Sequence, residues 1–290
     1  MNEEYFTLNG QSFFVRTWGD KTLPPLVMLH GFPEYSGAWA DLAARLSDRF
    51  YCVAPDQRGY GQSWAPPEVE AYKTRHLVSD IADLITQLGR GPVAVLGHDW
   101  GSAVAYGLAI GRPDLVSRLV VLNGVHPGPY QRACAAGGAQ TDAAQYIHAL
   151  RAADAEERFG ADGFARLFRL FAEGMDFSWM DAARRVEYAA EWAREGRLTG
   201  MLNWYRASPI QLGATGERLD VPEVPTDKFR VTMPHLLIWG VGDRALLPEA
   251  TEGLENWCDE LTRVELQDAD HWLAHQQPDA IAAQLRDFLL

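Results

Sequence analysis

The stretch Val93-Ala94-Val95-Leu96-Gly97-His98-Asp99-Trp100-Gly101-Ser102-Ala103 carries three local signals in succession. An apolar, β-branched run stops at Gly97, one carboxylate stands in the middle of a Gly-x-Asp-x-Gly frame, and small residues with helical spacing follow. These signals predict a strand, a sharp turn and a helix. Because glycines two residues before and after the centre relieve the crowding of such a turn, we expect the Asp99 side chain to project above the sheet.

A carboxylate at this position restricts the chemistry. Its attack on a carbonyl ester would give an anhydride, which is uphill, whereas its attack on an sp³ carbon with a strained or good leaving group gives an ordinary alkyl ester. Asp99 therefore points to epoxides or alkyl halides as substrates. The same short motif also occurs in ordinary turns, so partner residues elsewhere in the chain must decide between the two interpretations.

Composition indicates a globular enzyme with no charged polymer as its partner. The chain has 290 residues, of which 47% are hydrophobic and 22% charged, and its formal net charge is -13. Such a charge is repelled by nucleic acid and by anionic membranes, so we expect neither as a partner. The three cysteines show no pairing or metal-ligand spacing. Since no leader or membrane-spanning pattern is found, we expect a cytoplasmic protein.

Strand-like and helix-like segments alternate over the first part of the chain, which predicts right-handed crossovers and a mostly parallel sheet flanked by helices. The weakly alternating residues on either side of Asn9-Gly10 predict an antiparallel hairpin at the edge. The strands expected in this part are Phe6–Leu8, Ser12–Thr17, Pro25–Leu29, Tyr51–Ala54, the run before Gly97, and Leu119–Leu122.

The alternation of strand-like and helix-like segments stops after the sixth expected strand. Sheet-type runs are missing from residues 127–232, and strand signals return at His235–Trp239 and Thr262–Leu266 before a closing helix at Asp279–Leu290. We therefore expect a core domain of residues 1–126 and 233–290 with a helical cap domain of residues 127–232 inserted into it. The helices expected in the cap are Ala143–Ala152, Ala161–Ala172, Ala182–Arg194 and Thr199–Ser208.

Three candidate catalytic residues each follow the carboxyl end of a predicted strand: Asp99, Asp243 and His271. Ligands bind at that edge of an open α/β sheet, so residues distant in sequence meet there. The order nucleophile, acid, histidine is that of the α/β-hydrolase fold. In the expected roles, Asp99 forms an ester with the substrate, and His271, oriented by Asp243, activates the water that hydrolyses it.

An oxyanion hole is expected from two backbone N–H groups, those of Phe32 and Trp100. Phe32 lies in the loop after the strand Pro25–Leu29, and Trp100 directly follows the nucleophile. Pro33 in the same loop is expected to have a cis peptide bond in a tight turn.

Five strings of sequence together resemble the soluble-type epoxide hydrolases of the α/β-hydrolase superfamily, which are related to haloalkane dehalogenases. The resemblance spans nearly the whole chain and implies an α/β-hydrolase fold, a small apolar epoxide as substrate, and no metal or organic cofactor. The strings are His30-Gly31-Phe32-Pro33-Glu34, Gly97-His98-Asp99-Trp100-Gly101, the turn Gly240 to Asp243, Asp270-His271-Trp272 and Leu202-Asn203-Trp204-Tyr205-Arg206.

The resemblance also implies two cap tyrosines that donate hydrogen bonds to the epoxide oxygen as the ring opens. Tyr205 matches the second of them by its motif, and Tyr146 is the first by a looser match, with Tyr130 and Tyr188 as competitors for that role. A phenol held in an apolar cap can stabilise and protonate the developing alkoxide. The residues expected to line the substrate pocket are His30, Pro33, Trp204 and Trp272.

Two alternatives remain open from the sequence. A haloalkane or haloacid dehalogenase would use the same triad on an alkyl halide, although Phe32 stands where haloalkane dehalogenases usually carry asparagine, and no arginine directly follows the nucleophile. A non-catalytic small-molecule receptor on a hydrolase fold is the second alternative. A homodimer is compatible with the sequence, which leaves the oligomeric state open.

Overall fold

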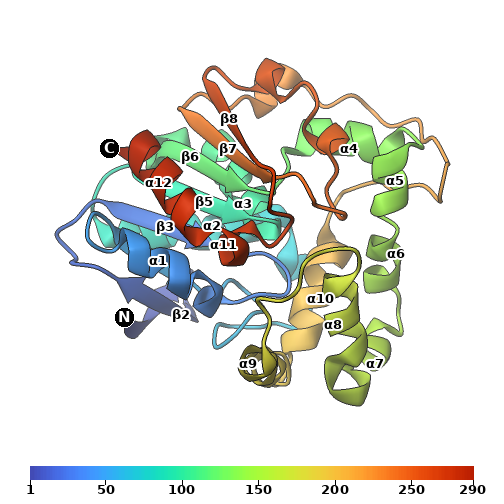
Figure 1. Cartoon of the computed structure of the whole chain (residues 1–290), viewed down its shortest axis with the longest axis horizontal. Coiled ribbons are helices and arrows are strands. Elements are labelled where there is room, and N and C mark those ends of the chain that lie inside the picture. The colour runs from blue at the N-terminus through green and yellow to red at the C-terminus, as the bar shows by residue number, and fades with distance from the viewer.

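The computed structural model describes residues 1–290 and contains one eight-stranded sheet (Figure 1). The strand order is β1-β2-β4-β3-β5-β6-β7-β8, in which β1, β2 and β4 pair antiparallel and all other neighbours pair parallel. The predicted hairpin and mostly parallel sheet are therefore confirmed. The strands are β1 (Asn2–Leu8), β2 (Gln11–Trp18), β3 (Pro25–Leu29), β4 (Tyr51–Pro55), β5 (Val93–His98), β6 (Val116–Leu122), β7 (His235–Gly240) and β8 (Leu261–Leu266).

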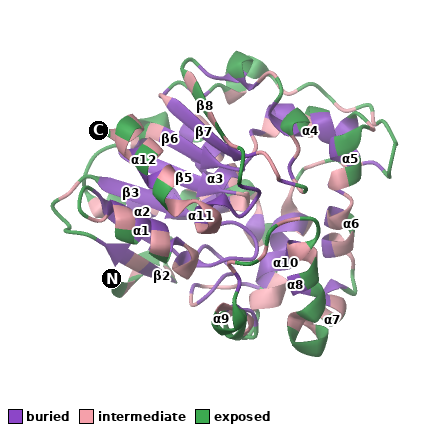
Figure 2. Cartoon of the chain, in the orientation of Figure 1, coloured by how far each residue is buried: buried purple, intermediate pink, exposed green.

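Helices cover both faces of the sheet, with α1, α11 and α12 on one side and α2 and α3 on the other (Figure 1). All residues of β3, β4 and β7 are buried as a result, which explains their continuous apolar runs (Figure 2). These helices are α1 (Ala40–Leu46), α2 (Thr74–Leu88), α3 (Trp100–Gly111), α11 (Leu273–Gln276) and α12 (Pro278–Leu289).

Between β6 and β7 the chain forms helices and connecting segments, on the right in Figure 1. The helices are α4 (Pro127–Ala135), α5 (Ala139–Ala143), α6 (Tyr146–Arg151), α7 (Ala155–Gly160), α8 (Ala165–Ala172), α9 (Ala182–Trp192) and α10 (Arg197–Ala207). Short 3-10 helices complete the structure at Ser36–Trp39, Val69–Tyr72, Pro113–Leu115, Ala161–Phe164, Thr226–Phe229, Pro248–Thr251 and Leu254–Trp257.

Several details of this helical segment differ from the prediction, among them the unpredicted α7. The helix expected at Ala143–Ala152 is divided into α5 and α6, and the unpredicted α4 begins at Pro127, whose fixed φ suits the first turn of a helix. The helix expected from Ala161 begins at Ala165, because the three preceding residues have positive φ values and interrupt the helical backbone.

Hydrogen bonds from the loop after β8 hold the helical segment over the sheet edge. The indole Nε1 of Trp272 donates to the carbonyl of Phe171 at 3.2 Å, and Asp270 accepts from the backbone N–H of Asp176 at 2.6 Å. Since this loop also carries His271, these hydrogen bonds connect the helical segment directly to the loop of the candidate site.

None of the helices combines the length and the apolar character that crossing a membrane requires.

Candidate active site

Asp99 occupies the sharp turn between β5 and α3, with φ 49° and ψ −121°. The turn depends on its glycines: a Cβ on Gly101 would lie 2.0 Å from the carbonyl oxygen of Leu29, and one on Gly97 would lie 2.6 Å from the carbonyl oxygen of Gly101. Glycine at both places therefore allows α3 to approach the neighbouring strand closely while Asp99 is held above the sheet.

The two carboxylate oxygens of Asp99 have different surroundings. Oδ1 accepts a hydrogen bond of 2.7 Å from the backbone N–H of Phe32, and Oδ2 lies 3.8 Å from Nε2 of His271. Phe32 follows β3 and precedes a cis peptide bond to Pro33. Trp100 is the first residue of α3, so its N–H belongs to the amides that have no partner within the helix.

His271 is oriented by the fully buried carboxylate of Asp243. Nδ1 of His271 lies 2.8 Å from Oδ2 of Asp243, and the same oxygen accepts from the Asn123 side-chain amide at 2.7 Å. The other oxygen accepts from the backbone N–H groups of Ala245 and Leu246, at 2.8 and 3.0 Å. With every lone-pair direction of the acid engaged, Asp243 can remain ionised in the interior.

Asn123 is a site residue that the sequence analysis missed. It directly follows β6, has φ 30°, and its side-chain amide also bonds the N–H and C=O of Gly240 at 2.7 and 3.1 Å. The asparagine thus links the ends of β6 and β7 and supports Asp243. Its position at the carboxyl end of a predicted strand was the available signal, but an asparagine there is also typical of an ordinary turn.

The charges of the triad are coupled. Burial opposes protonation of His271, but the carboxylates of Asp243 and Asp99 outweigh burial and raise the pKa of His271 to about 9. Burial likewise disfavours ionised Asp243, yet His271 and Asn123 hold the pKa of that carboxyl below its usual range. The resting site therefore holds a protonated imidazole between two carboxylates.

A second buried cluster supports the backbone of His271. Nε2 of His98 lies 2.8 Å from the carbonyl oxygen of His271, and Nδ1 of the same ring lies 3.2 Å from Glu34. Glu34 also contacts His275 at 2.6 Å and accepts a 3.2 Å hydrogen bond from the hydroxyl of Tyr188. Burial raises the pKa of Glu34, but the two histidines more than compensate and hold it well below its usual range. Tyr188 thus serves this cluster, not the Asp99 cavity.

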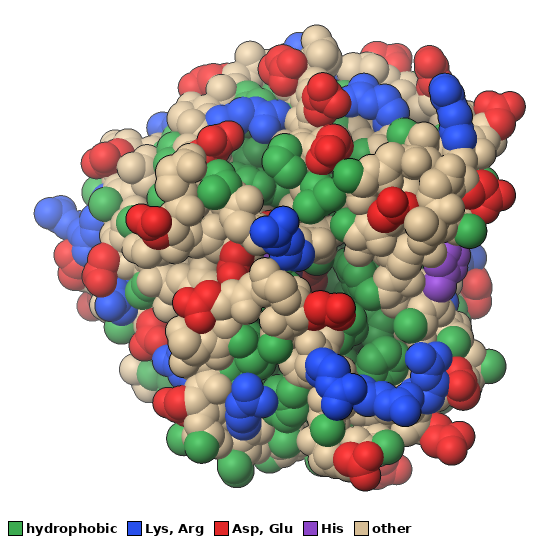
Figure 3. Space-filling view, turned by 45° about the vertical axis from the view of Figure 1, so that its right-hand side comes forward, with side chains coloured by type: hydrophobic (Ala, Val, Ile, Leu, Met, Phe, Trp, Pro, Cys, Tyr) green, Lys and Arg blue, Asp and Glu red, His purple; other side chains and the backbone are tan.

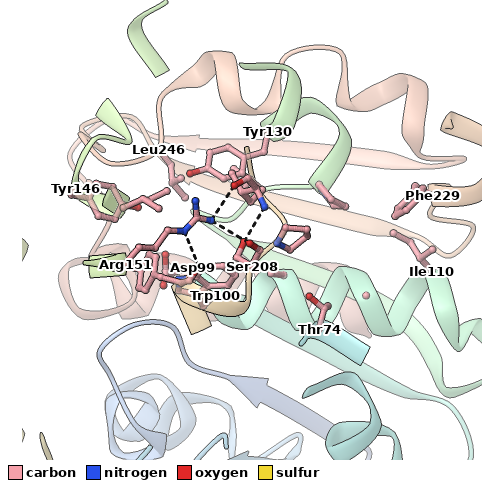
Figure 4. A pocket seen from close by; sticks show the side chains of 18 of the residues that line it. Thr74, Asp99, Trp100, Ile110, Tyr130, Tyr146, Arg151, Ser208, Phe229 and Leu246 are labelled. Carbon is pink, nitrogen blue, oxygen red and sulfur yellow. Dashed lines mark hydrogen bonds between the residues drawn. The ribbon is translucent and has the colours of Figure 1, made fainter. Parts of the chain in front are cut away.

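A cavity of about 370 Å³ lies beside Asp99 and extends along α3, with Tyr130, Tyr146 and Tyr205 in its wall (Figure 4). A smaller one of about 50 Å³ joins Asp99, His271 and the pair Tyr146 and Tyr205. The rings of that pair are 6.2 Å apart, edge to face. Burial raises the pKa of both phenols well above its usual value, so both hydroxyls are protonated donors at neutral pH. The structure therefore brings together Asp99, His271 and both expected cap tyrosines.

The expected pocket residues are only partly found at a cavity. Trp272 lines the smaller cavity, but His30, Pro33 and Trp204 line neither of the two. His30 is fully buried, and its Nε2 accepts from the backbone N–H of Gln57. The indole of Trp204 donates to the carbonyl of Arg58, and its ring lies edge to face against that of Trp100, one layer behind the wall. His30 and Trp204 therefore support the site without lining it, and the carbonyl of Pro33 accepts a hydrogen bond of 2.7 Å from the indole of Trp192.

The surface on the side of the helical segment is hollowed between two raised parts of the molecule (Figure 3). Hydrophobic side chains form the floor of the hollow, and several Lys and Arg side chains gather along its lower edge.

Known proteins resemble the chain over its full length. A family model described as the alpha/beta hydrolase fold matches residues 24–278. An AB hydrolase superfamily protein, YfhM of Bacillus subtilis, is 31% identical over 99% of this chain and 97% of its own length. Human epoxide hydrolase 4 is 29% identical over 97% of this chain and 76% of its own length.

Solved structures agree with the sequence relatives. A metagenomic epoxide hydrolase from a hot environment superposes with a TM-score of 0.90 at 35% identity, covering 100% of this chain and 98% of that one. The Bacillus megaterium epoxide hydrolase superposes with a TM-score of 0.87 at 27% identity, covering 99% of both chains. Together with the strand order and the turn at Asp99, these matches show that the chain belongs to the α/β-hydrolase family, among the relatives of the epoxide hydrolases.

Proposed function

We propose that the protein hydrolyses epoxides to vicinal diols through a covalent ester on Asp99. One observation carries the proposal: a carboxylate in the nucleophile position shares a cavity with two protonated phenols and lies beside a buried His–Asp pair. The names of the relatives support the same activity. The substrate is expected to be small and mostly apolar, because hydrophobic side chains predominate in the wall of the 370 Å³ cavity.

In the first step, Oδ2 of Asp99 attacks an epoxide carbon while Oδ1 stays bound to the N–H of Phe32. The ring C–O bond breaks as the Asp99–carbon bond forms. The developing alkoxide takes up a proton from Tyr205 or Tyr146. Their raised pKa keeps both phenols protonated at neutral pH, and a phenol is intrinsically a stronger acid than the aliphatic alcohol that forms. The phenolate that remains then takes up the proton of His271, which leaves the imidazole neutral.

In the second step, neutral His271 accepts a proton from a water molecule that attacks the ester carbonyl. Esterification removes the charge of Asp99, which is one of the groups that raise the pKa of His271. The pKa of the imidazole therefore falls toward neutral pH, where a general base is most effective. The N–H groups of Phe32 and Trp100 stabilise the tetrahedral oxyanion. As the tetrahedral intermediate collapses, the C–O bond of the ester breaks, and His271 passes the proton taken from water to the leaving alkoxide, which completes the diol. The proton of the regenerated Asp99 carboxyl then returns to the neutral imidazole of His271.

The deciding experiment is a turnover screen of the purified protein on styrene oxide, an aliphatic epoxide, a bromoalkane and fluoroacetate, with the Asp99→Ala variant as the control. Diol formation that is lost in Asp99→Ala, without halide release, is the expected result. Halide release without diol formation would replace the proposal with a dehalogenase. If none of the four compounds reacts, the proposal fails and a binding function on a hydrolase fold takes its place.

A further inference from the structure

Arg151, the last residue of α6, projects its guanidinium into the 370 Å³ cavity that contains Asp99 (Figure 4). Its Nε donates to the carbonyl of Tyr205 at 2.9 Å, and its Nη2 donates to the carbonyls of Ser208 and Ile210 at 3.3 and 3.0 Å. These bonds use three of the five N–H groups of the side chain. The two N–H groups of Nη1 have no partner in the protein.

The charge of Arg151 is not balanced by the protein. No carboxylate lies within salt-bridge distance, and the ionisable groups that face it are the phenols of Tyr130 and Tyr205 and the thiol of Cys134, which are neutral at neutral pH. Two other enclosed arginines have acidic partners, since Arg58 pairs with Asp80 and Arg206 pairs with Glu156. Arg197, like Arg151, bonds only backbone carbonyls, but it does not line the cavity.

Burial lowers the pKa of Arg151, and of the groups that oppose this effect, Tyr130, Cys134 and Tyr205, none is a carboxylate. The guanidinium remains charged, because arginine keeps its proton in proteins. Among the residues of the cavity wall it is the single Lys or Arg, and Asp99 is the single carboxylate. A charge exposed to a mostly apolar cavity is costly unless an opposite charge enters with the ligand.

We propose that Arg151 is a specificity-determining residue that binds a carboxylate of the substrate through Nη1. The inference rests on the proposed function and narrows it: the preferred substrates are epoxides with an apolar body and a carboxylate at the other end. Arg151 and Tyr146 belong to the same helix and are separated by a rise of roughly 7.5 Å. One rigid element thus presents a proton donor for the ring and an anchor for the acid.

The three bonds to carbonyls also give Arg151 a structural role, because they fix the end of α10 behind Tyr205. That role involves Nε and Nη2 and affects every substrate equally. Binding of a carboxylate involves Nη1 and affects only substrates that carry the acid. Comparing an epoxy acid with its own primary amide therefore separates the two roles, since the amide is close in shape and uncharged.

The experiment measures kcat/KM of a terminal epoxide that ends in a carboxylate and of the corresponding primary amide, in the wild type and in Arg151→Met. The wild type is expected to prefer the acid. Arg151→Met is expected to lower kcat/KM for the acid by roughly 10- to 100-fold, mostly through KM, with a much smaller change for the amide, since a hydrogen bond to a charged group is lost.

Arg197→Met is the matched control, because Arg197 also donates to two backbone carbonyls, those of Gly61 and Glu195, but does not line the cavity. The preference for the acid should survive in this variant. Equal losses for acid and amide in Arg151→Met would overturn the inference and leave only the structural role.

Calorimetric binding of the corresponding dihydroxy acid and dihydroxy amide separates this inference from the proposed function. Tighter binding of the acid that disappears in Arg151→Met supports the subsite even if the protein opens no epoxide. If the protein turns over neutral epoxides but binds the dihydroxy acid and the dihydroxy amide equally well, the proposed function stands and the carboxylate subsite is ruled out.

Discussion

Nε2 of His271 lies 3.8 Å from Oδ2 of Asp99, whereas Nδ1 of the same ring lies 2.8 Å from Asp243. The imidazole is therefore hydrogen-bonded to Asp243, and its other nitrogen lies farther from Asp99 than a hydrogen bond reaches. A base that activates water beside an ester requires this spacing, because the water must reach both the ring nitrogen and the carbonyl carbon of Asp99.

His271→Gln should separate the two chemical steps. Ring opening needs Asp99 and the tyrosines, so the ester should still form, whereas hydrolysis should slow by roughly 10²- to 10⁴-fold because its general base is missing. Intact-mass spectrometry after addition of substrate should show the protein plus one substrate molecule. Asp99→Ala should show no added mass, and an adduct in that variant would place the nucleophile elsewhere.

Asp99→Asn should lower the pKa of His271. The amide is neutral like the ester, so it removes one of the carboxylates, Asp243, Asp99 and Glu34, that raise the pKa of the imidazole to about 9. Titration of the His271 ring by NMR in both proteins measures the shift. An unchanged pKa would mean that Asp99 does not contribute to it, and the proposed fall of the His271 pKa upon esterification would be wrong.

Stability should depend on pH through His271. The folded-state pKa of about 9 lies above the ordinary value of 6.5, so the native state binds more protons than the unfolded state between these values. The stabilisation is fully present below pH 6.5 and is lost as the pH rises through 9. Urea unfolding across this range should show the free-energy difference between wild type and His271→Gln shrinking as the pH rises. A constant difference would contradict the raised pKa.

The positions of Asp99, Asp243 and His271 could be predicted because each follows a strand whose sequence signal is local. In a parallel sheet the carboxyl ends of the strands meet at one edge, so the order of the strands suffices to bring such residues together. The turn at Asp99 could be predicted for the same reason. Its two glycines, each within two residues of Asp99, are needed because a Cβ at either place would clash with the backbone.

The supports and the lining of the site could not be predicted in this way. Whether His30 or Trp204 faces the cavity depends on contacts with Gln57 and Arg58, which lie far away in sequence. From the sequence, Arg151 is an ordinary basic residue in a predicted helix, and only the fold places it in the wall of the cavity that Asp99 lines. Side-chain direction within the helical segment follows from packing against the sheet edge, and that packing is not encoded in any short motif.

Tyr205→Phe and Tyr146→Phe should each slow ring opening of epoxides by roughly 10²-fold or more and leave turnover of an alkyl bromide comparatively unaffected, because bromide leaves without a proton. Single-turnover kinetics on both substrates measures the contrast. Tyr188→Phe is the comparison, since its hydroxyl is bound to Glu34 and not to the cavity. A loss of ring opening in Tyr188→Phe that matches the other two would show that the assignment of the donors is wrong.

Asn123→Ala should impair ester hydrolysis more than ester formation. The substitution removes a 2.7 Å donor from Asp243, so the carboxylate loses part of its stabilisation and orients His271 less firmly, while the groups around Asp99 stay in place. Single-turnover rates for the two steps should show hydrolysis slower by about 10-fold and ring opening nearly unchanged.

Ser63→Ala is the matched control for that variant, because Ser63 is also buried but donates to the carbonyl of Asp56 and does not contact the triad. Both substitutions leave a buried acceptor short of a donor, and both should lower stability. Only Asn123→Ala should change the ratio of the two rates. If both steps slow equally in Asn123→Ala, the residue holds β6 and β7 together without acting through Asp243, and the histidine depends on the acid alone.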